Sequence, residues 1–142
     1  MSDLTADQII AQLDLAPHPE GGFYRQTWVA ENEGRATGTC IYFLLKAGQE
    51  SHWHAVDAVE IWHYYAGAPL ILSLAPSLVG PAVDHMLGPD LSAGLFPQTI
   101  VPEGHWQKAA TTGHWTLVGC TVSPGFQFEG FTLANPGVDI PR

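Results

Sequence analysis

The sequence predicts an all-β fold of the sandwich or jelly-roll type, preceded by one short helix. Its 142 residues include 15 glycines and 11 prolines, which favour many turns over long helices. Between these turn residues lie short runs rich in β-branched and aromatic side chains, the pattern expected of a sandwich or jelly roll. A chain of this length with 46% apolar residues can bury a substantial core, so we expect a single domain over residues 1–142.

The expected helix begins after Thr5 and ends before Pro17. Thr5 and Gln8 form a capping-box pattern, in which each side chain accepts a hydrogen bond from the other residue's backbone N–H. The apolar residues that follow are spaced to share one side of a helix: Ile9, Ile10 and Leu13. A proline disfavours helical geometry in the residue before it, which sets the end of the helix. We expect this helix to be structural and to lie against the strands.

The expected strands follow the helix in short segments. They are predicted at residues 23–30, 38–46, 61–65, 70–74, 98–101, 104–109, 114–122 and 130–133. Residues 84–96 contain two glycines and a proline and are predicted to form a long loop. The two cysteines, Cys40 and Cys120, lie in apolar strand-like runs, so we expect buried thiols and no disulfide.

The charge balance excludes several classes of partner. Fourteen acidic and five basic residues give a formal net charge of −9, which repels nucleic-acid phosphates and anionic membranes. The first residues lack the basic and apolar segments of a secretory signal, and no apolar run approaches the roughly 20 residues of a spanning helix. We therefore expect a cytoplasmic protein with a small-molecule ligand and neither a nucleic-acid nor a membrane partner.

Residues 48–67 concentrate the side chains that metal binding or acid–base chemistry requires. On a strand, His52 and His54 are two residues apart and leave the same face. Asp57 and Ala58 suit a tight turn, and an antiparallel hairpin would return Glu60 to the two imidazoles. Two imidazoles and one carboxylate suit one divalent ion of zinc, nickel, manganese or iron. The alternative is that these histidines are ordinary surface or core residues.

Several sequence blocks resemble the small single-domain cupin subfamily, most of whose members are of unknown function. Residues 48–67 are similar to the first cupin motif and residues 102–107 to the second, and further blocks are 18–25, 60–67 and 117–128. The resemblance implies a cupin-type jelly-roll β-barrel with a short N-terminal helix. It implies a site at His54 and Glu60, with His52 restoring a histidine pair. Gln107 stands where a histidine ligand is usual, and its carbonyl oxygen is a possible fourth metal ligand.

Four aromatic residues within or beside the candidate ligand strands suggest a pocket wall on which a sugar or heterocycle stacks: Trp53, Trp62, Tyr64 and Trp106. On a regular strand, Trp62 and Tyr64 share the face of Glu60. The alternative is that these rings fill the interior of a small barrel.

Two further side chains receive conditional roles. An arginine at the pocket mouth would bind a carboxylate or phosphate, which makes Arg25 a candidate for substrate binding. Its alternative role is to pair with one of the acidic residues. His63 lies opposite Glu60 on a regular strand, where we expect it to brace the outer layer or a dimer interface.

The function predicted from these residues is proton transfer on a small polar metabolite. His54 and Glu60, with or without a divalent metal, would move a proton next to a carbonyl group. The enzymes that small cupins resemble make an isomerase or epimerase of a sugar-like or carboxylate-bearing compound the expected class. The alternatives are a non-catalytic binding protein and a metal-dependent oxygenase or lyase, which Gln107 makes less attractive. A homodimer formed through an edge strand is also expected.

Overall fold

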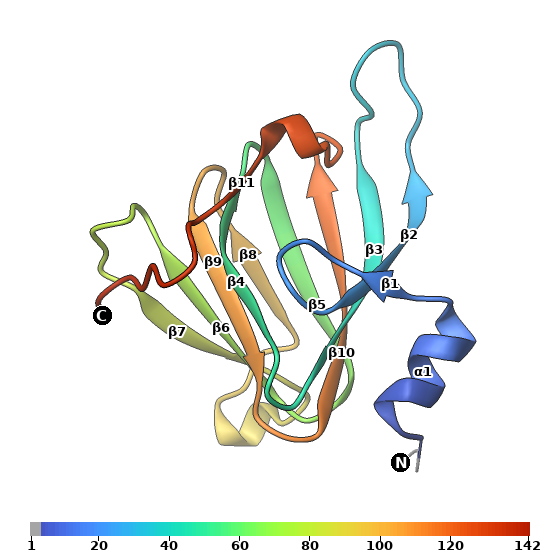
Figure 1. Ribbon diagram of the computed structural model, residues 1–142, viewed down its shortest axis with the longest axis vertical. Helices are drawn as coiled ribbons and strands as arrows, with labels where there is room; N and C mark the ends of the chain where they lie inside the picture. The colour runs from blue at the N-terminus through green and yellow to red at the C-terminus, as the bar shows by residue number, and fades with distance from the viewer. Residues whose placement is uncertain (1–3) are drawn as a thin grey trace.

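Two antiparallel sheets face each other in the computed structural model, which describes residues 4–142 (Figure 1). The larger sheet contains, in spatial order, β1 (Ala16–Pro17), β2 (Phe23–Val29), β3 (Thr39–Lys46), β10 (Trp115–Ser123), β5 (Val59–Gly67) and β8 (Gln98–Val101). The smaller sheet contains β11 (Phe131–Leu133), β4 (Glu50–Val56), β9 (Trp106–Thr111), β6 (Leu70–Ala75) and β7 (Val83–Leu87). This arrangement confirms the predicted all-β jelly-roll fold.

The predicted N-terminal helix is present as α1 (Ala6–Leu13), outside the six-stranded sheet (Figure 1). The Gln8 backbone N–H donates to the Thr5 hydroxyl at 3.2 Å, and the Thr5 N–H donates to the Gln8 side chain at 2.8 Å, which completes the capping box. Ile9 is buried against Leu15 and Leu44, so the helix covers one end of this sheet. Within residues 4–142, no helix is long and apolar enough to cross a membrane.

Side chains from both inner faces form the main core. The buried members of this cluster are Phe43, Leu45, Trp62, Leu70, Leu72, Leu74, Leu87, Val101, Ala109, Val118 and Cys120. Both cysteines are free thiols, as predicted, with Cys120 buried and Cys40 only half-buried. The core leaves the cavity described below unfilled, because several inward positions there carry polar side chains.

The predicted hairpin between residues 52 and 60 does not form. Strand β4 pairs with β9 and β11, whereas β5 pairs with β10 and β8. The short connection at Asp57 and Ala58 therefore passes from one sheet to the other. A connection of this length suits a hairpin and a corner equally well, and the strands that decide between them are distant in sequence. Consequently His54 and Glu60 belong to opposite sheets.

The segment predicted as a loop at residues 84–96 contains strand β7 and a short 3-10 helix, Leu91–Ala93. Strand β7 lies at the edge of the five-stranded sheet and carries mostly half-buried or exposed side chains. Its pairing with β6 is reinforced by the Ser73 hydroxyl, which donates to the Asp84 carboxylate at 2.5 Å. Edge strands lack the clear apolar alternation on which sequence prediction depends, which explains the error.

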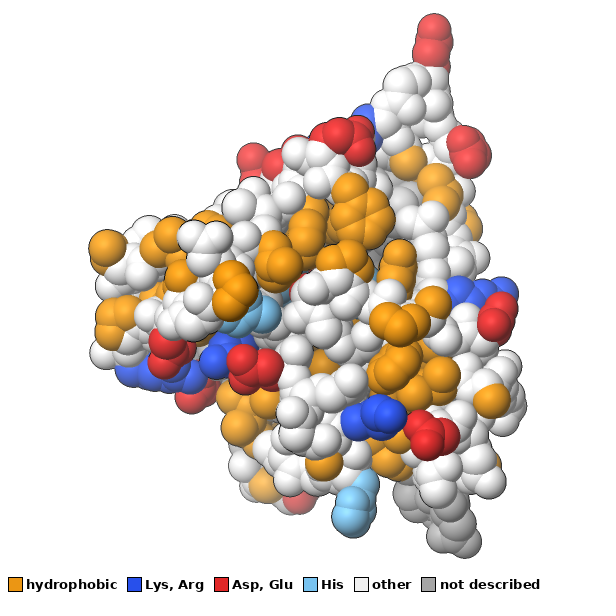
Figure 2. Space-filling model, in the orientation of Figure 1, with side chains coloured by type: hydrophobic (Ala, Val, Ile, Leu, Met, Phe, Trp, Pro, Cys, Tyr) orange, Lys and Arg blue, Asp and Glu red, His pale blue; other side chains and the backbone are white. Residues whose placement is uncertain are grey.

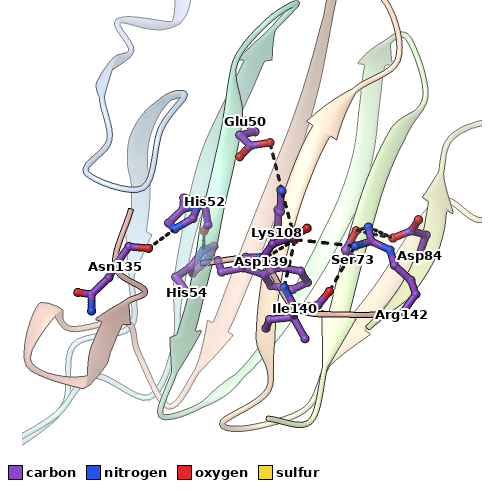
Figure 3. Close-up of polar contacts among 11 residues, drawn as sticks. Glu50, His52, His54, Ser73, Asp84, Lys108, Asn135, Asp139, Ile140 and Arg142 are labelled. Atoms are coloured by element: carbon purple, nitrogen blue, oxygen red, sulfur yellow. Dashed lines mark hydrogen bonds and ion pairs between the residues drawn. The ribbon is translucent and has the colours of Figure 1, made fainter. Parts of the chain in front are cut away.

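The C-terminal segment, residues 134–142, crosses the outer face of the five-stranded sheet (Figures 1 and 3). Its Ala134 N–H donates to the Trp53 carbonyl at 2.9 Å. Farther along, the Pro141 carbonyl accepts from a backbone N–H, and Arg142 pairs with Asp84 at 2.8 Å. Trp53 and Ile140 are fully buried beneath and within this segment. The segment thus forms a second, outer core behind strand β4.

Candidate active site

A cavity of about 150 Å³ lies between the two sheets. Strands β2, β3, β4, β5 and β10, the loop 18–22 and the segment 126–128 supply its walls. The lining residues are His18, Glu20, Tyr24, Gln26, Thr39, Ile41, His54, Val56, Glu60, Val122, Phe126 and Phe128. The cavity therefore combines two imidazoles and two carboxyl groups with an otherwise largely apolar and aromatic wall.

His54 presents an unprotonated ring nitrogen toward Glu20. Its Nδ1 lies 2.8 Å from the His52 backbone carbonyl, and a carbonyl only accepts hydrogen bonds, so Nδ1 carries the proton. In the neutral ring Nε2 is then a free base, 3.5 Å from Glu20 Oε1. Burial lowers the pKa of His54, and the opposite charge of Glu60 counteracts part of that shift. The geometry suits a general base.

Glu20 reaches His54 from the loop 18–22. The Glu20 backbone carbonyl accepts from the His52 N–H at 2.8 Å, and its carboxyl group accepts from the Ser51 hydroxyl. Burial raises the pKa of Glu20 to about 8, against the smaller opposing effect of Ser51. At neutral pH the contact with His54 therefore joins a carboxylic acid to a neutral imidazole and is not an ion pair.

Two consecutive glycines shape this loop. Gly21 and Gly22 have φ angles of 109° and 79°, which side-chain-bearing residues rarely adopt. The Gly21 N–H donates to the His18 carbonyl at 3.0 Å, and the His18 N–H donates to the Gly22 carbonyl at 2.9 Å. A side chain at Gly21 would collide with the Glu50 carbonyl oxygen of strand β4. The glycines thus allow the loop to press Glu20 against β4.

Replacing Gly21 by alanine is expected to lower the free energy of unfolding by about 2 kcal/mol or more, through φ strain and the collision with β4. Gly48→Ala is the matched control, because Gly48 has a φ of 81° but an added Cβ there would have no atom within 4 Å beyond its chain neighbours. That variant should lose about 1 kcal/mol from strain alone. Urea unfolding measures both values. Equal losses would show that the loop does not press on β4.

His18 complements His54 with the opposite tautomer. The Glu20 backbone N–H donates to His18 Nδ1 at 3.1 Å, so Nδ1 is unprotonated and Nε2 carries the hydrogen. The ring stacks edge-on against Tyr24 with centroids 4.4 Å apart. Burial, and secondarily the charge of His54, lower the pKa of His18 to about 4. Since no hydrogen bond described within residues 4–142 uses Nε2, this N–H can donate to a molecule in the cavity.

Glu60 is held from the opposite sheet by a chain of buried hydrogen bonds. The Trp62 indole N–H donates to Gln107 Oε1 at 2.7 Å, and Gln107 Nε2 donates to Glu60 Oε1 at 2.9 Å. The indole only donates, which fixes the orientation of the glutamine amide. Burial raises the pKa of Glu60 to about 7, although His54 and the donors around Glu60 oppose the shift. Glu60 therefore titrates near neutrality.

His52 does not lie beside His54 as predicted. The register between β4 and β9 shifts between Ser51 and His54, which breaks the alternation that would place the two histidines on one face. His52 Nε2 contacts the Asn135 carbonyl at 3.0 Å on the outer side of the sheet (Figure 3). The side chains of Ser51 and His54, and not that of His52, contact the Glu20 carboxyl group. The predicted same-face histidine pair is therefore wrong.

The predicted metal-ligand set, namely His52, His54, Glu60 and Gln107, does not fit a metal ion in this arrangement. His52 points away from the cavity, and the Gln107 oxygen accepts from Trp62 while the amide nitrogen faces Glu60. In the described part of the chain, no three side chains of His, Cys, Asp or Glu are grouped so that they could hold a metal. The hydrogen bonds instead suit groups that exchange protons.

None of the five residues predicted to bind substrate lines the cavity, and three of them lie on outer faces of the sheets. Arg25 falls between two cavity-facing residues of β2, so its side chain leaves the other face and donates to the Leu13 carbonyl at 3.2 Å. Trp53 and Trp106 pack in the outer core beneath the C-terminal segment. The register shift in β4 and the C-terminal cover, neither of which is apparent from the sequence, account for the position of Trp53.

Trp62 and Tyr64 do share the inner side of β5 with Glu60, as their parity predicts. Neither lines the cavity, because Trp62 is buried in the main core and Tyr64 packs against it with its hydroxyl donating to the Gly67 carbonyl at 2.6 Å. The alternative interpretation, that these rings fill the interior, therefore describes them better. His63 lies on the outer side, where its Nε2 contacts the Thr121 hydroxyl at 3.1 Å.

Sequence reasoning missed His18, Glu20 and the aromatic rings that line the cavity. Two local signals were available. The block 18–25, which resembles a block of the subfamily, contains His18, Glu20 and Tyr24, and Glu20 stands immediately before Gly21 and Gly22, where paired glycines indicate a tight turn close to another backbone. The cavity rings come from Tyr24 on β2 and from Phe126 and Phe128 near the end of the chain. Nothing local distinguishes these rings from ordinary core residues.

The glutamates of the cavity make a specific prediction for stability. Between pH 6.5 and 8 Glu20 is ionised in the unfolded chain but keeps its proton in the folded protein up to its pKa of about 8. The folded state then binds more protons, so the free energy of unfolding falls as pH rises, by at most about 1.4 kcal/mol per pH unit for each such group. His18 and His54 have lowered pKa values, so their opposing effect ends near pH 6.5.

In Glu20→Gln, the free energy of unfolding is therefore expected to fall less steeply with pH above 6.5. The remaining fall, up to about pH 7, is the contribution of Glu60. Urea unfolding at several pH values between 6.5 and 8 measures the slope. Glu50→Gln, at an exposed position of β4, is the control and should keep the wild-type slope. A wild-type slope in Glu20→Gln would show that Glu20 is ionised in the folded protein.

Comparison with known proteins is consistent with this architecture. Residues 7–134 match the family model described as Cupin superfamily (DUF985). Protein SO0799 from Shewanella oneidensis is 40% identical over 93% of this chain and 85% of its own, with a TM-score of 0.87. A hypothetical protein from Leishmania major is 30% identical over 95% of this chain and 90% of its own, with a TM-score of 0.83.

More distant structures share the fold. Oxalate decarboxylase from Bacillus subtilis has a TM-score of 0.64 at 13% identity, over 82% of this chain and 29% of the decarboxylase. At that identity the likeness concerns the fold alone. No curated protein matches the chain.

Proposed function

Because the chain belongs to the cupin superfamily, in the family DUF985, we propose that its barrel cavity is the active site of an enzyme that moves a proton on a small polar metabolite, as isomerases and epimerases do. The observation that carries this proposal is the free Nε2 of His54 at 3.5 Å from the Glu20 carboxyl group, with Glu60 lining the same cavity. A base and an acid close together in a buried site are what proton transfer requires.

The proposed reaction begins with a carbonyl compound in the cavity. His54 Nε2 takes a proton from the carbon next to the carbonyl, and the carboxylic acid of Glu20 gives its proton to the carbonyl oxygen, which forms an enol. Ionised Glu60 stabilises the imidazolium of His54. In an isomerisation of a hydroxy-carbonyl compound, His54 returns the proton to the former carbonyl carbon and the hydroxyl group on the neighbouring carbon gives its proton to Glu20, which moves the carbonyl group by one carbon. In an epimerisation, the enol turns over in the cavity before His54 returns the proton to the opposite face of the same carbon and the enol hydroxyl returns its proton to Glu20. Either course restores both residues.

The walls of the cavity support a small substrate. Tyr24, Phe126 and Phe128 supply rings on which a sugar-like compound can pack, and His18 supplies an N–H donor for an oxygen atom. The predicted role of Arg25 as an anchor for a carboxylate has no support, because that side chain contacts the helix end. A sugar-like carbonyl compound is therefore favoured over a sugar acid.

Hydrogen exchange tests this proposal without knowledge of the product. The protein is incubated in D₂O with pools of sugars, amino sugars and sugar acids, and mass spectrometry reads the gain of one mass unit per exchanged hydrogen. We expect protein-dependent exchange at one carbon-bound position of at least one compound. Compounds that raise the melting temperature but show no exchange would contradict the enzyme and favour the non-catalytic binding protein.

A further inference from the structure

The cavity is lined by two buried carboxyl groups and two imidazoles of lowered pKa, but by no lysine or arginine of the described residues. Glu60 and the side chain of Glu20 are 6% and 9% exposed, so solvent does little to screen them. All five Lys and Arg residues lie in the described part of the chain, and none lines the cavity. They make contacts elsewhere: Arg25 with the Leu13 carbonyl, Arg35 with Asp57, Lys46 with Asp7, Lys108 with Glu50 and Arg142 with Asp84. On the face shown in Figure 2, the blue groups likewise adjoin red ones.

Aromatic rings form the wall near these carboxyl groups. Tyr24, Phe126 and Phe128 all line the cavity, and the rings of Phe126 and Phe128 meet edge to face with centroids 4.9 Å apart. The face of an aromatic ring attracts a cation, with about 0.5–2 kcal/mol per favourable contact. Carboxyl oxygens and ring faces together form an environment that favours a positive charge over a negative one.

The largely buried imidazole of His18 offers a hydrogen-bond donor to the cavity. This residue is only 8% exposed, and its protonated Nε2 remains available while Nδ1 accepts from the Glu20 backbone. A donor in such a position is satisfied by an oxygen atom of a bound molecule. A ligand that offers a hydroxyl or carbonyl oxygen to His18, as well as a group that donates to the carboxyl oxygens, therefore matches the side chains of the cavity.

We propose that the cavity takes a small cationic amine that also carries hydroxyl or carbonyl oxygens, such as an amino sugar. The ammonium group donates to the carboxyl oxygens of Glu20 and Glu60 and lies against the rings, while His18 donates to an oxygen of the ligand. This inference rests on the proposed function for the location of the site and names the substrate class. The net charge of −9 acts in the same direction, because it draws cations toward the protein and repels anions.

Ligands matched in size but not in charge test the inference. Glucosamine, glucose and glucuronate form one set, and ethanolamine, ethylene glycol and glycolate form a smaller one. Isothermal titration calorimetry on the full-length protein measures each dissociation constant. We expect the amine of at least one set to bind at least tenfold more tightly than its neutral partner, and the anion to bind most weakly.

Two variants locate the binding. Glu60→Gln, which keeps the size of the side chain, is expected to weaken binding of the amine about tenfold or more while leaving the neutral compound nearly unchanged. Phe128→Leu, at a half-exposed ring, should weaken the amine about two- to fivefold and provides a second test if the first variant does not fold. The exposed Glu50→Gln is the control and should bind as the wild type does.

Several outcomes would overturn the inference. These are equal or tighter binding of a neutral or anionic member in both sets, no binding of either amine at millimolar concentration, and stoichiometric uptake of zinc, nickel, manganese or ferrous iron that Glu60→Gln abolishes. The proposed function fails separately. Amine binding without hydrogen exchange contradicts the enzyme alone, whereas exchange of a neutral sugar or sugar acid supports the enzyme and contradicts the amine.

Discussion

Replacement of His54 by asparagine is expected to slow carbon-bound hydrogen exchange by a factor of about 10²–10⁴, because a positioned general base contributes an acceleration of that size. The imidazole is the group whose free nitrogen faces Glu20 in the cavity, and asparagine offers no comparable base. The measurement is the initial rate of deuterium incorporation into whichever compound the wild-type protein exchanges. Urea unfolding of the same variant establishes that it remains folded.

His52→Asn is the matched control for this experiment. The two residues share one strand and one side-chain type, but His52 contacts the Asn135 carbonyl outside the cavity (Figure 3). Its replacement should change the exchange rate by less than about twofold. Loss of activity in both variants would instead support the same-face histidine pair predicted from the sequence, and loss in His52→Asn alone would place the site on the outer face.

Replacement of Trp53 by alanine is expected to lower the free energy of unfolding by about 3–5 kcal/mol, as removal of a large buried aromatic does. The ring is fully buried, and its indole N–H donates to the Asp139 carboxylate at 3.2 Å. The substitution removes both the packing beneath the C-terminal segment and this hydrogen bond. Chemical denaturation measures the loss, and limited proteolysis should show earlier cleavage within residues 134–142.

Trp28→Ala serves as the comparison, because Trp28 is 54% exposed and lies on the outer side of the six-stranded sheet. Surface substitutions of this kind usually change stability by about 1 kcal/mol or less. A similar small change in Trp53→Ala would mean that the C-terminal segment does not pack on strand β4. Equal large losses would mean that Trp28 is buried in solution, as in the predicted homodimer.

The elements that the sequence predicts well are those that depend on local signals. The capping box at Thr5 and Gln8 fixes the start of α1, and the apolar runs locate most strands within a few residues. Strand pairing is a property of distant segments, which explains why the connection after β4 was predicted as a hairpin although it joins two sheets. The positions of the strands were thus predicted correctly, but the pairing of β4 and β5 was not.

The site divides in the same way. The motif that includes His54 and Glu60 led to two residues that line one cavity, although their catalytic roles remain a prediction. The position of His52 depended on a one-residue register shift, which the sequence of β4 does not reveal. The contribution of Glu20 depended on a loop that lies 31 residues before its partner Ser51. The sequence of one motif does not predict which residues a distant loop will bring into contact with it.

The two groups that we propose as proton-transferring groups come from different kinds of segment, which has a consequence for how this scaffold can diversify. His54 lies on strand β4 of a sheet, whereas Glu20 lies on the loop 18–22, which Gly21 and Gly22 allow to approach that sheet closely. Substitutions in the loop 18–22 would change the group at position 20, while the sheets and His54 stay in place. A barrel of this kind can therefore acquire a different acid group, and with it a different reaction, through replacement of a short loop.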